Sequence, residues 1–461
     1  MKFDAAEVIE FTDPTKMSRD ELRALQWRRL KRQLAYNYAN APFHRERLDA
    51  AGLHPEDIRT WDDFLKVPVM NKSDHRGAQE ESITRFGHPF GMLGCAPLEK
   101  FVLIAATSGT SGLPTFYTLT DRDLKIFSEL QARKYRRMGL RPGDRVLHAF
   151  ALSMMVGGVP FLQTLRSYGA CIVPVGAEVG SQRLLEFARL TRPRMLVCTP
   201  SYAEYIADKC FDVLGIPARD LGIEIILCGG EPGASLPDLR QKIESAYGGR
   251  LYDYTGLIHT FHGISCGAPG VGMHFISEDY CVLEILDQET KRPLELKEGV
   301  VGEMVYTYLD IEGSPLMRYA LGDVLEISTA PCTCGWTGLS FKILGRSDDM
   351  LIVKGVNVYP AAIRNVVAGF VPRTTGQIRV ILDRPGHKVT PPLNLVVEHG
   401  AEVEQNQLRA LASELENRIH DKLKVRPKID LVEPGTLQRS TYKTKLVEVL
   451  SSKGTADSQA A

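Results

Sequence analysis

The sequence lacks an excess of charge of either sign, because Lys+Arg and Asp+Glu each number 56 in 461 residues and the formal net charge is zero. A neutral balance argues against a general binder of nucleic acids or of anionic membranes, although it leaves room for a local basic patch. We therefore expect neither nucleic acid nor membrane among its partners.

The sequence also lacks a long apolar run and a disulfide framework. The most apolar region, 150–165 (FALSMMVGGVPFLQTL), is too short to span a bilayer and is interrupted by glycines and a proline. The N-terminal stretch MKFDAAEVIEFTDP has acidic residues and no continuous apolar segment, so we expect no secretory signal. Nine cysteines, an odd number in a large chain, favour a reducing compartment. These absences predict a cytoplasmic protein.

The chain instead shows regular alternation of strand-like and helix-like segments. Residues 19–53 have helical periodicity. From about 101 to 326, amphipathic helical stretches separate short apolar runs, namely FVLIAAT, RVLHAF, ACIVPV, RMLVCTP and IEIILCGG. This order predicts an α/β fold with a largely parallel sheet, in which ligands bind beyond the carboxyl ends of the strands.

A domain boundary is expected near 345–349 (GRSDD). Beyond it a smaller α+β pattern contains MLIVKG, GQIRVILD, PLNLVVEH, a charged helix at about 404–424, and PKIDLVEP. We predict an N-terminal domain over 1–345, a C-terminal domain over 346–450, and a disordered tail at 451–461, which is small and polar.

The segment 107–115, TSGTSGLPT, combines glycines with small hydroxylated residues directly after the run FVLIAAT. Backbone N–H groups and hydroxyls of such a turn can surround phosphate oxygens. The Walker A pattern GxxxxGK[ST] is absent, because Pro114 and Thr115 stand where a lysine is needed. Taken alone, the segment is equally compatible with a flexible surface loop.

Further motifs follow this loop in a fixed order: GGEPG at 229–233, YDYTGL at 252–257, RYALGD at 318–323, GRSDDMLIVKGVNVYP at 345–360 and RSTYK at 439–443. The series resembles the core motifs of the adenylate-forming acyl-CoA synthetase superfamily, and most closely the phenylacetate–CoA ligase family. The resemblance covers nearly the whole chain. It implies a large N-terminal α/β domain with layered β-sheets and a small, mobile α+β lid domain.

The resemblance implies an ATP-dependent, AMP-forming carboxylic acid–CoA ligase. Its carboxylate substrate reacts with ATP to give acyl-AMP and pyrophosphate, and the CoA thiol then displaces AMP. ATP, Mg²⁺ and CoA are the implied cofactors, and family members are commonly homodimers. Two alternatives stay open: an adenylating enzyme that passes the acyl group to an amine or carrier protein, and a nucleotide-binding pseudoenzyme.

The family's ATP-binding roles map onto matching positions of this sequence. The β- and γ-phosphates would be cradled by Thr107, Ser108, Gly109, Thr110, Ser111 and Gly112. The adenine side would be lined by Gly230, Glu231 and Pro232, followed by Tyr254 and Thr255. Asp323 would accept hydrogen bonds from both ribose hydroxyls, which suits a carboxylate.

The lid domain would contribute the remaining roles. Arg346 would contact ribose or phosphate, Asp348 would be the hinge residue, and the loop around Gly355 would line the CoA channel. Lys443 matches the late catalytic lysine of the family. Because Tyr442 replaces the usual glycine of that motif, Lys445 is a competitor.

One position departs from the family pattern. Where the family has YGLSE, with a glutamate that helps to hold Mg²⁺, this chain has TGLIH, ending in His259. A neutral histidine is a poorer ligand for Mg²⁺ than a carboxylate. Phosphates, water or another carboxylate would then hold the metal, or His259 and His262 would face the substrate, or both would be satisfied by local hydrogen bonds.

A structural metal site is a separate expectation. Three thiols and an imidazole, from Cys266, His274, Cys332 and Cys334, would complete a tetrahedral Zn²⁺ site. The phenylacetate-type ligases often show a comparable arrangement. The C-x-C spacing is tighter than the usual C-x₂-C, so ordinary free cysteines are the alternative.

The acyl pocket should be lined by 150–158 and by residues near Gly229 and Gly256. Met154, Met155 and Val156 either belong to the core or shorten the pocket. The sequence therefore leaves two substrate classes open: an aryl acid such as phenylacetate, and a small branched or hydroxylated acid such as 2-hydroxyisobutyrate.

Overall fold

The computed structural model describes residues 9, 11–107, 114–231, 233–259, 261–268, 272–384, 386–437 and 446–450, with the side chains at 261 and 262 outside this description. The chain forms two compact units. The first unit extends to Ser235 and resumes over Arg240–Ile343, and the second takes Leu236–Leu239 and the chain from Leu344 onward.

Helices form the N-terminal part of the first unit: η1 (Pro14–Lys16), α1 (Arg19–Asn40), α2 (Pro42–Ala50), α3 (Trp61–Phe64), α4 (Lys72–Phe86) and η2 (Leu98–Lys100). The helical segment predicted over 19–53 is confirmed, and it divides at Ala41, whose extended backbone precedes Pro42. Ser18 and Glu21 form a capping box that starts α1. Among the helices of the described ranges, none has the length and apolarity needed to cross a bilayer.

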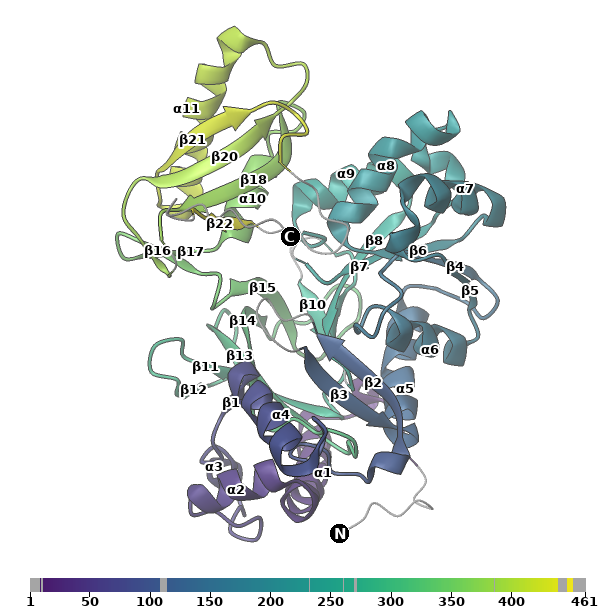
Figure 1. Cartoon of the computed structure of the whole chain (residues 1–461), viewed down its shortest axis with the longest axis vertical. Helices are drawn as coiled ribbons and strands as arrows, with labels where there is room; N and C mark the ends of the chain where they lie inside the picture. The colour runs from purple at the N-terminus through teal and green to yellow at the C-terminus, as the bar shows by residue number, and fades with distance from the viewer. Residues whose placement is uncertain are drawn as a thin grey trace, which may run out of the picture. The chain divides into compact units, whose positions relative to one another are not determined.

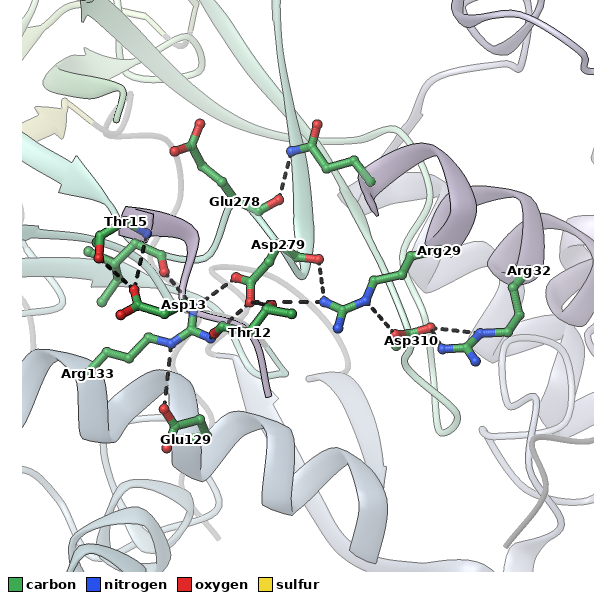
Figure 2. A network of polar contacts seen from close by, with 12 residues as sticks. Thr12, Asp13, Thr15, Arg29, Arg32, Glu129, Arg133, Glu278, Asp279 and Asp310 are labelled. Atoms are coloured by element: carbon green, nitrogen blue, oxygen red, sulfur yellow. Dashed lines mark hydrogen bonds and ion pairs between the residues drawn. The ribbon is translucent and has the colours of Figure 1, made fainter. Parts of the chain in front are cut away.

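A buried ionic network fixes α1 to the rest of this unit (Figure 2). Arg133 binds the carboxylate of Asp279 through two hydrogen bonds of 2.8 and 2.9 Å, and Arg29 donates to the Asp279 carbonyl oxygen at 2.8 Å. Arg29 also pairs with Asp310 at 2.9 Å, and Arg32 pairs with the same carboxylate. Both carboxylates are buried, so the charges compensate one another away from water.

Parallel strands form one half of the main sheet, in the order β5 (Cys171–Pro174), β4 (Arg145–His148), β6 (Met195–Cys198), β7 (Ile225–Gly229) and β8 (Arg250–Gly256). Four of these strands, β4, β5, β6 and β7, confirm predicted apolar runs. Their connections carry α6 (Val159–Tyr168), η3 (Ala177–Val179), α7 (Ser181–Thr191), α8 (Pro200–Leu214), η4 (Ala218–Leu221) and α9 (Pro237–Tyr247). Figure 1 shows α7 and α8 packed beside this half of the sheet.

The other half of the sheet is mainly antiparallel, which corrects the prediction of a largely parallel sheet. From β8 it continues as β9 (Phe261–Ser265), β10 (Met273–Phe275), β15 (Ser340–Arg346), β14 (Tyr319–Ser328), β13 (Val301–Tyr308), β11 (Cys281–Leu286) and β12 (Pro293–Leu294). β1 (Met70–Asn71) adds to β14 in parallel. Connections as short as the one between β8 and β9 cannot hold the crossover that parallel neighbours require.

A separate hairpin and one long helix complete the first unit. β2 (Phe101–Thr107) and β3 (Thr115–Thr120) pair in antiparallel fashion. The helix α5 (Asp121–Arg137) begins directly after β3 with a capping box of Thr120 and Asp123. Its buried residues join the main hydrophobic core together with the inner faces of the sheet.

The second unit has its own sheets and its own core. β16 (Leu351–Val353) lies between β17 (Val356–Val358) and β19 (Lys388–Val389). A second sheet has the order β21 (Pro427–Val432), β20 (Leu393–His399), β18 (Thr374–Leu382) and β22 (Val447–Val449). The helices α10 (Pro360–Ala368) and α11 (Gln405–Leu423) contribute to a core that contains only residues of this unit. The α+β pattern predicted from the sequence is therefore confirmed.

Candidate active site

The hairpin β2–β3 holds the two ends of the segment 107–115 side by side. Thr107 pairs with Thr115 in the ladder, and Thr115 is fully buried. Ser108, Gly109, Thr110, Ser111 and Gly112, predicted to bind phosphate, lie outside the described residues. The strands on either side of this segment pair as an antiparallel hairpin, so β2 is followed along the chain by β3 and not directly by a helix.

The loop 150–158, predicted to line the acyl pocket, lies against the strand that precedes the predicted phosphate loop. The backbone N–H of Ala106 donates to the carbonyl oxygen of Met154 at 2.9 Å, and Ala106 and Met155 form a parallel bridge. Met154 is 42% exposed, whereas Met155 and Val156 are half-buried. The predicted acyl loop is thus adjacent to the strand that leads into the predicted phosphate loop.

The carboxyl ends of β7 and β8 meet at a glycine. A Cβ atom at Gly229 would lie 2.7 Å from the ring of Tyr254, so the close approach of the ring requires glycine. Gly230 follows with φ +87°, a conformation that favours glycine. Glu231 is buried and its Oε1 accepts a hydrogen bond of 2.9 Å from the backbone N–H of Ser201, at the start of α8.

Residues from this edge were predicted to surround adenine, and the structure brings most of them together. Gly230, Glu231, Tyr254 and Thr255 lie at or just beyond the ends of neighbouring parallel strands, while Pro232 lies outside the described residues. Thr255 is half-buried. Grouping at the carboxyl edge of a parallel sheet is where α/β folds bind ligands.

His259 is fully buried, with a positive φ of 73°. Its Nε2 lies 2.9 Å from the carbonyl oxygen of Thr118, and because a carbonyl only accepts, Nε2 carries the proton. Burial lowers the pKa of His259 to about 4, so the ring is neutral at pH 7. This geometry is that of an imidazole tied to β3, and the predicted catalytic role of His259 remains a prediction.

The two charged residues of the motif RYALGD have different environments. Arg318 is buried, has φ 44°, and binds Glu284 with its Nη2 at 2.9 Å. The same guanidinium donates to the carbonyl oxygens of Leu65 and Val67, so Arg318 joins β14 to the N-terminal helices. Asp323, predicted to bind ribose, is half-buried on the same strand.

In the second unit, two predicted residues bind each other. The guanidinium of Arg346 donates to both carboxylate oxygens of Asp348, at 2.7 and 2.6 Å. Gly355 has φ +80° in the turn between β16 and β17, and a Cβ there would meet no atom within 4 Å. Lys443, Lys445 and Tyr442 lie outside the described residues.

The residues predicted to bind zinc converge from β10 and from loops of the first unit. The donor atoms of Cys266, His274, Cys332 and Cys334 all lie within 4.8 Å of one another. Cys266 Sγ and Cys332 Sγ are 3.6 Å apart, and Cys334 Sγ is 3.2 Å from His274 Nε2. His274 Nδ1 lies 2.8 Å from Ser340 Oγ, which orients the ring so that Nε2 faces the thiols.

The structure also adds residues that the sequence analysis did not single out. Arg137 Nη2 donates to Cys334 Sγ at 2.8 Å, which places a positive charge beside the thiol cluster. Lys134, one turn earlier on α5, is fully buried among aromatic rings. The sequence does not distinguish these two residues from the other charged residues of the helix. Only the amphipathic spacing, which turns one face of the helix inward, could have indicated such contacts.

The paired strands β2 and β3, the glycines at the strand ends and the loop 150–158 are arranged as expected for an adenylate-forming enzyme, and comparison with family models establishes that class. Residues 54–309 match the family model described as "AMP-binding enzyme", and residues 355–448 match "AMP-binding enzyme C-terminal domain". The chain belongs to the AMP-binding enzyme family.

The chain is similar to several named ligases. The chain is 34% identical to a phenylacetate-coenzyme A ligase of Thermus thermophilus over 92% of this chain and 95% of that one. It is 31% identical to a phenylacetate-coenzyme A ligase of Aromatoleum evansii over 92% and 93%. A crystal structure of 2-hydroxyisobutyryl-CoA ligase in the postadenylation state, in complex with R3-HIB-AMP, matches with a TM-score of 0.85 and 28% identity, over 94% of this chain and 90% of that one. The family resemblance inferred from the motifs is confirmed.

Proposed function

We propose that the protein is an ATP-dependent, AMP-forming carboxylic acid–CoA ligase that works through an acyl-adenylate. The observation that carries the proposal is the hydrogen bond between Ala106 and Met154, which joins the phosphate-loop strand to the predicted acyl loop. Adenylation requires a carboxylate and the α-phosphate of ATP to be held in line, so the two binding segments must be adjacent. The relatives named above are CoA ligases, which supports CoA as the acceptor.

Each predicted binding residue has a definite task in this proposal. The loop at 107–112 would cradle the phosphates, Gly230 and Glu231 would border adenine, and Asp323 would accept hydrogen bonds from ribose. ATP would enter as its Mg²⁺ complex, in which the metal neutralises phosphate charge. Lys443 would approach the carboxylate and α-phosphate during adenylation.

The C-terminal domain, 346–450, would be a mobile lid in this scheme, with Asp348 as its hinge and Gly355 at the CoA channel. Both side chains of the ion pair between Arg346 and Asp348 are partly exposed, so the pair can break and be replaced by contacts with water. This supports a hinge at this segment. Such a hinge needs only a few residues that absorb the dihedral change.

The deciding experiment is a screen of aryl, short-chain and hydroxylated acids for AMP formation that depends on both acid and CoA. Lys443→Ala should abolish acid-dependent pyrophosphate exchange, while Lys445→Ala, its neighbour in the same motif, should retain it. If no acid produces AMP above background, the ligase proposal fails and a pseudoenzyme remains. If saturating CoA never accelerates turnover of any activated acid, an amine or carrier protein is the acceptor.

The acid itself belongs to one of two classes. Phenylacetate is supported by the names of the curated relatives, and a small hydroxylated acid such as 2-hydroxyisobutyrate by the name of the structural neighbour. The partial exposure of Met154, Met155 and Val156 supports their contact with a bound acid. The acid screen distinguishes the two classes directly.

We further propose that the thiol cluster binds one structural Zn²⁺. Three sulfur donors and one imidazole nitrogen, mutually within 4.8 Å, fit a tetrahedral ion with Zn–S distances of about 2.3 Å. The contacts of Ser340 with His274 and of Arg137 with Cys334 are the kind of outer partners that metal ligands have. When bound, zinc would clamp β10 to the loop that precedes β15.

Metal analysis of chelator-washed protein tests the clamp. We expect about one equivalent of zinc, lost in His274→Ala together with a lower melting temperature, because structural zinc contributes folding free energy. Cys171→Ser is the matched control, since this exposed cysteine lies outside the cluster. Less than about half an equivalent in the wild-type protein would reject the zinc proposal.

We also propose where the protein is located in the cell and how it assembles. All nine cysteines are free thiols, which supports a reducing, cytoplasmic location. A homodimer is proposed from the family resemblance, and sedimentation velocity at several concentrations tests it.

A further inference from the structure

The imidazole of His148 joins the end of β4 to the far end of the loop 150–158. The side chain is 0% exposed, and its Nε2 lies 2.7 Å from the carbonyl oxygen of Gly157. Because a carbonyl only accepts, Nε2 carries the proton and donates this hydrogen bond. Burial lowers the pKa of His148 to about 4, so the ring is neutral at pH 7. The loop is therefore bonded, where it ends, to the strand from which it departs.

Two further hydrogen bonds hold the earlier part of the loop. The backbone N–H of Leu152 donates to Oε1 of Glu178 at 2.6 Å, and the carbonyl oxygen of Met154 accepts from Ala106 at 2.9 Å. The loop is thus attached near its start, at its middle and at its end. Glu178 is exposed, so water can replace its contact, whereas the bond from His148 comes from a buried side chain.

The position of Phe150 depends on where the loop returns. A Cβ atom at Gly157 would lie 3.2 Å from the ring of Phe150, so this ring packs on the backbone of Gly157. The ring centroid lies 5.9 Å from that of His148 and 6.5 Å from that of Tyr254, at the edge predicted to border adenine. Phe150 is half-buried in the loop predicted to line the acyl pocket. His148 therefore holds the backbone that supports this ring.

An aromatic ring supported in this way limits how far a bound acid can extend. The ring of Phe150 can move away only if Gly157 moves too, which breaks the bond from His148 and leaves a buried donor without its acceptor. A pocket with a fixed end discriminates by about tenfold or more against an acid longer by one methylene group. A pocket whose end can shift accepts both acids.

We propose that His148 is a positioning residue of the ligase reaction: its hydrogen bond to Gly157 fixes the loop 150–158 and the ring of Phe150, and so sets the length of acid that the site accepts. His148 acts through the loop and contacts neither the acid nor ATP. The inference rests on the proposed ligase function. It also rests on the prediction that this loop lines the acyl pocket.

The test uses the best acid of the screen and its homologue longer by one methylene group. The discrimination ratio is kcat/KM for the first acid divided by kcat/KM for the second, measured as AMP formation that depends on CoA. For the wild-type enzyme we expect a ratio of about ten or more. A wild-type ratio near one would overturn the proposal, because the end of the pocket would then not be fixed.

Three variants separate positioning from stability. His148→Leu removes the donor, so the ratio should fall to about one and KM for the acid should rise, while KM for ATP stays within about twofold. His148→Gln places an amide donor near the position of Nε2 and should retain most of the ratio. Gly157→Ala keeps His148 but forces Phe150 to move by a few tenths of an ångström, so it should also change the ratio.

His44→Leu is the matched control, because His44 is also buried and its Nε2 lies 2.9 Å from the carbonyl oxygen of Pro315, outside the loop 150–158. It should lower the melting temperature as His148→Leu does and keep the wild-type ratio. A lower melting temperature of His148→Leu with a wild-type ratio and KM would show that His148 is only structural.

If His148→Leu does not fold, Gly157→Ala decides, and a wild-type ratio in that variant overturns the proposal. Failure of every acid to yield AMP would reject the ligase function itself. AMP formation with the same ratio in the wild type and in the folded variants rejects only the positioning role of His148.

Discussion

At the scale of single residues, His259 combines a family motif with a departure from it. The family pattern predicts a magnesium-binding carboxylate at this position, but the imidazole is 0% exposed and bonded to the carbonyl of Thr118. A buried ring held in this way fits a role in positioning the segment that follows β8. The structure thus favours the local hydrogen-bond interpretation over direct contact with Mg²⁺.

Replacing His259 by phenylalanine tests this interpretation. The change removes the donor to Thr118, so we expect the free energy of unfolding to fall by about 1–3 kcal/mol. The Mg²⁺ concentration for half-maximal pyrophosphate exchange should stay unchanged. A marked rise in that concentration would show that His259 takes part in binding the metal. His54→Phe, at an exposed histidine, serves as the control.

Candidate site residues were easiest to predict from the sequence where they form short ordered motifs. Gly230, Glu231, Tyr254 and Thr255 were assigned to the adenine side from the family resemblance, and they lie together at the carboxyl edge formed by β7 and β8. The thiol cluster was predictable from residue type, and its convergence confirms that these donors can meet. The motif alone could not show that Arg318 and Asp323 have different environments, because the pairing of Arg318 with Glu284 depends on contacts between distant strands.

At the scale of secondary-structure elements, α1 is held by charges as well as by apolar packing. Leu30 and Leu34 enter a core with Phe64 and Met317. Beside them, Asp279 accepts hydrogen bonds from Arg133, Arg29 pairs with Asp310, and all of these groups are largely buried (Figure 2). Breaking a buried pair by removing one charge is costly, because the other charge stays buried.

We therefore expect Asp279→Asn to lower the free energy of unfolding by about 3–5 kcal/mol. The substitution keeps the size and approximate shape of the side chain, removes its charge, and replaces one of the two oxygens that accept from Arg133 by an NH2 donor. Asp212→Asn is the matched control, because Asp212 pairs with Lys209 on the surface and both side chains are largely exposed. Urea unfolding measures both. Equal effects of the two changes would show that the buried network contributes little.

Helices and strands with a simple hydrophobic periodicity could be predicted from the sequence. Strands whose direction and neighbours depend on pairing with distant strands could not. The strands β4, β6 and β7 appear in the sequence as apolar runs because both of their faces are covered. The antiparallel half of the sheet was missed because strand direction depends on connection length and on pairing at a distance. Only the first strand of the hairpin β2–β3 was predicted from the sequence, and its second strand was not.

At the scale of the whole molecule, the second unit has a core of its own. Val380, Leu395 and Leu415 are fully buried in a cluster that contains only residues after Leu344. A domain with an independent core can fold alone. A fragment of 344–461 should therefore give a dispersed NMR spectrum and a cooperative thermal transition.

Two substitutions make the fragment experiment specific. Leu395→Ala should destabilise the fragment by about 2–5 kcal/mol, because it deletes buried methyl groups and leaves a cavity. Lys428→Ala, at an exposed position of β21, should leave its stability unchanged. A disordered wild-type fragment would mean that this core needs the first unit in order to form.

The first unit should be sensitive to mild acid because several of its histidines are buried and neutral. Burial lowers the pKa of His44, His148 and His259 to about 4 and that of His75 to about 3. The unfolded chain titrates its histidines near pH 6.5, so between these values it binds more protons than the folded state. Stability is fully present above about pH 6.5 and is lost as the pH falls toward 4.

Buried carboxyl groups act in the opposite direction at lower pH. Burial raises the pKa of Asp123 and Asp253 to about 6, so the folded state binds protons there that the unfolded chain does not bind until about pH 4. Their contribution grows as the pH falls from 6 to 4 and offsets part of the histidine effect. The loss of stability per pH unit should therefore increase as the pH falls from 7 to about 6 and then stay nearly constant between about pH 6 and 5, because the carboxyl groups offset the further protonation of the unfolded histidines.

Urea unfolding at intervals between pH 7.5 and 4.5 measures this profile, and one variant assigns it to a residue. His75→Gln keeps a donor for the carbonyl of Phe116 but cannot be protonated, so it should reduce the slope by up to about 1.4 kcal/mol per pH unit. His54→Gln, at an exposed position, should leave the slope unchanged. If the His75→Gln profile has the wild-type slope, protonation of His75 does not drive acid unfolding, and the offset from Asp123 and Asp253 must be measured in the same way with Asn variants.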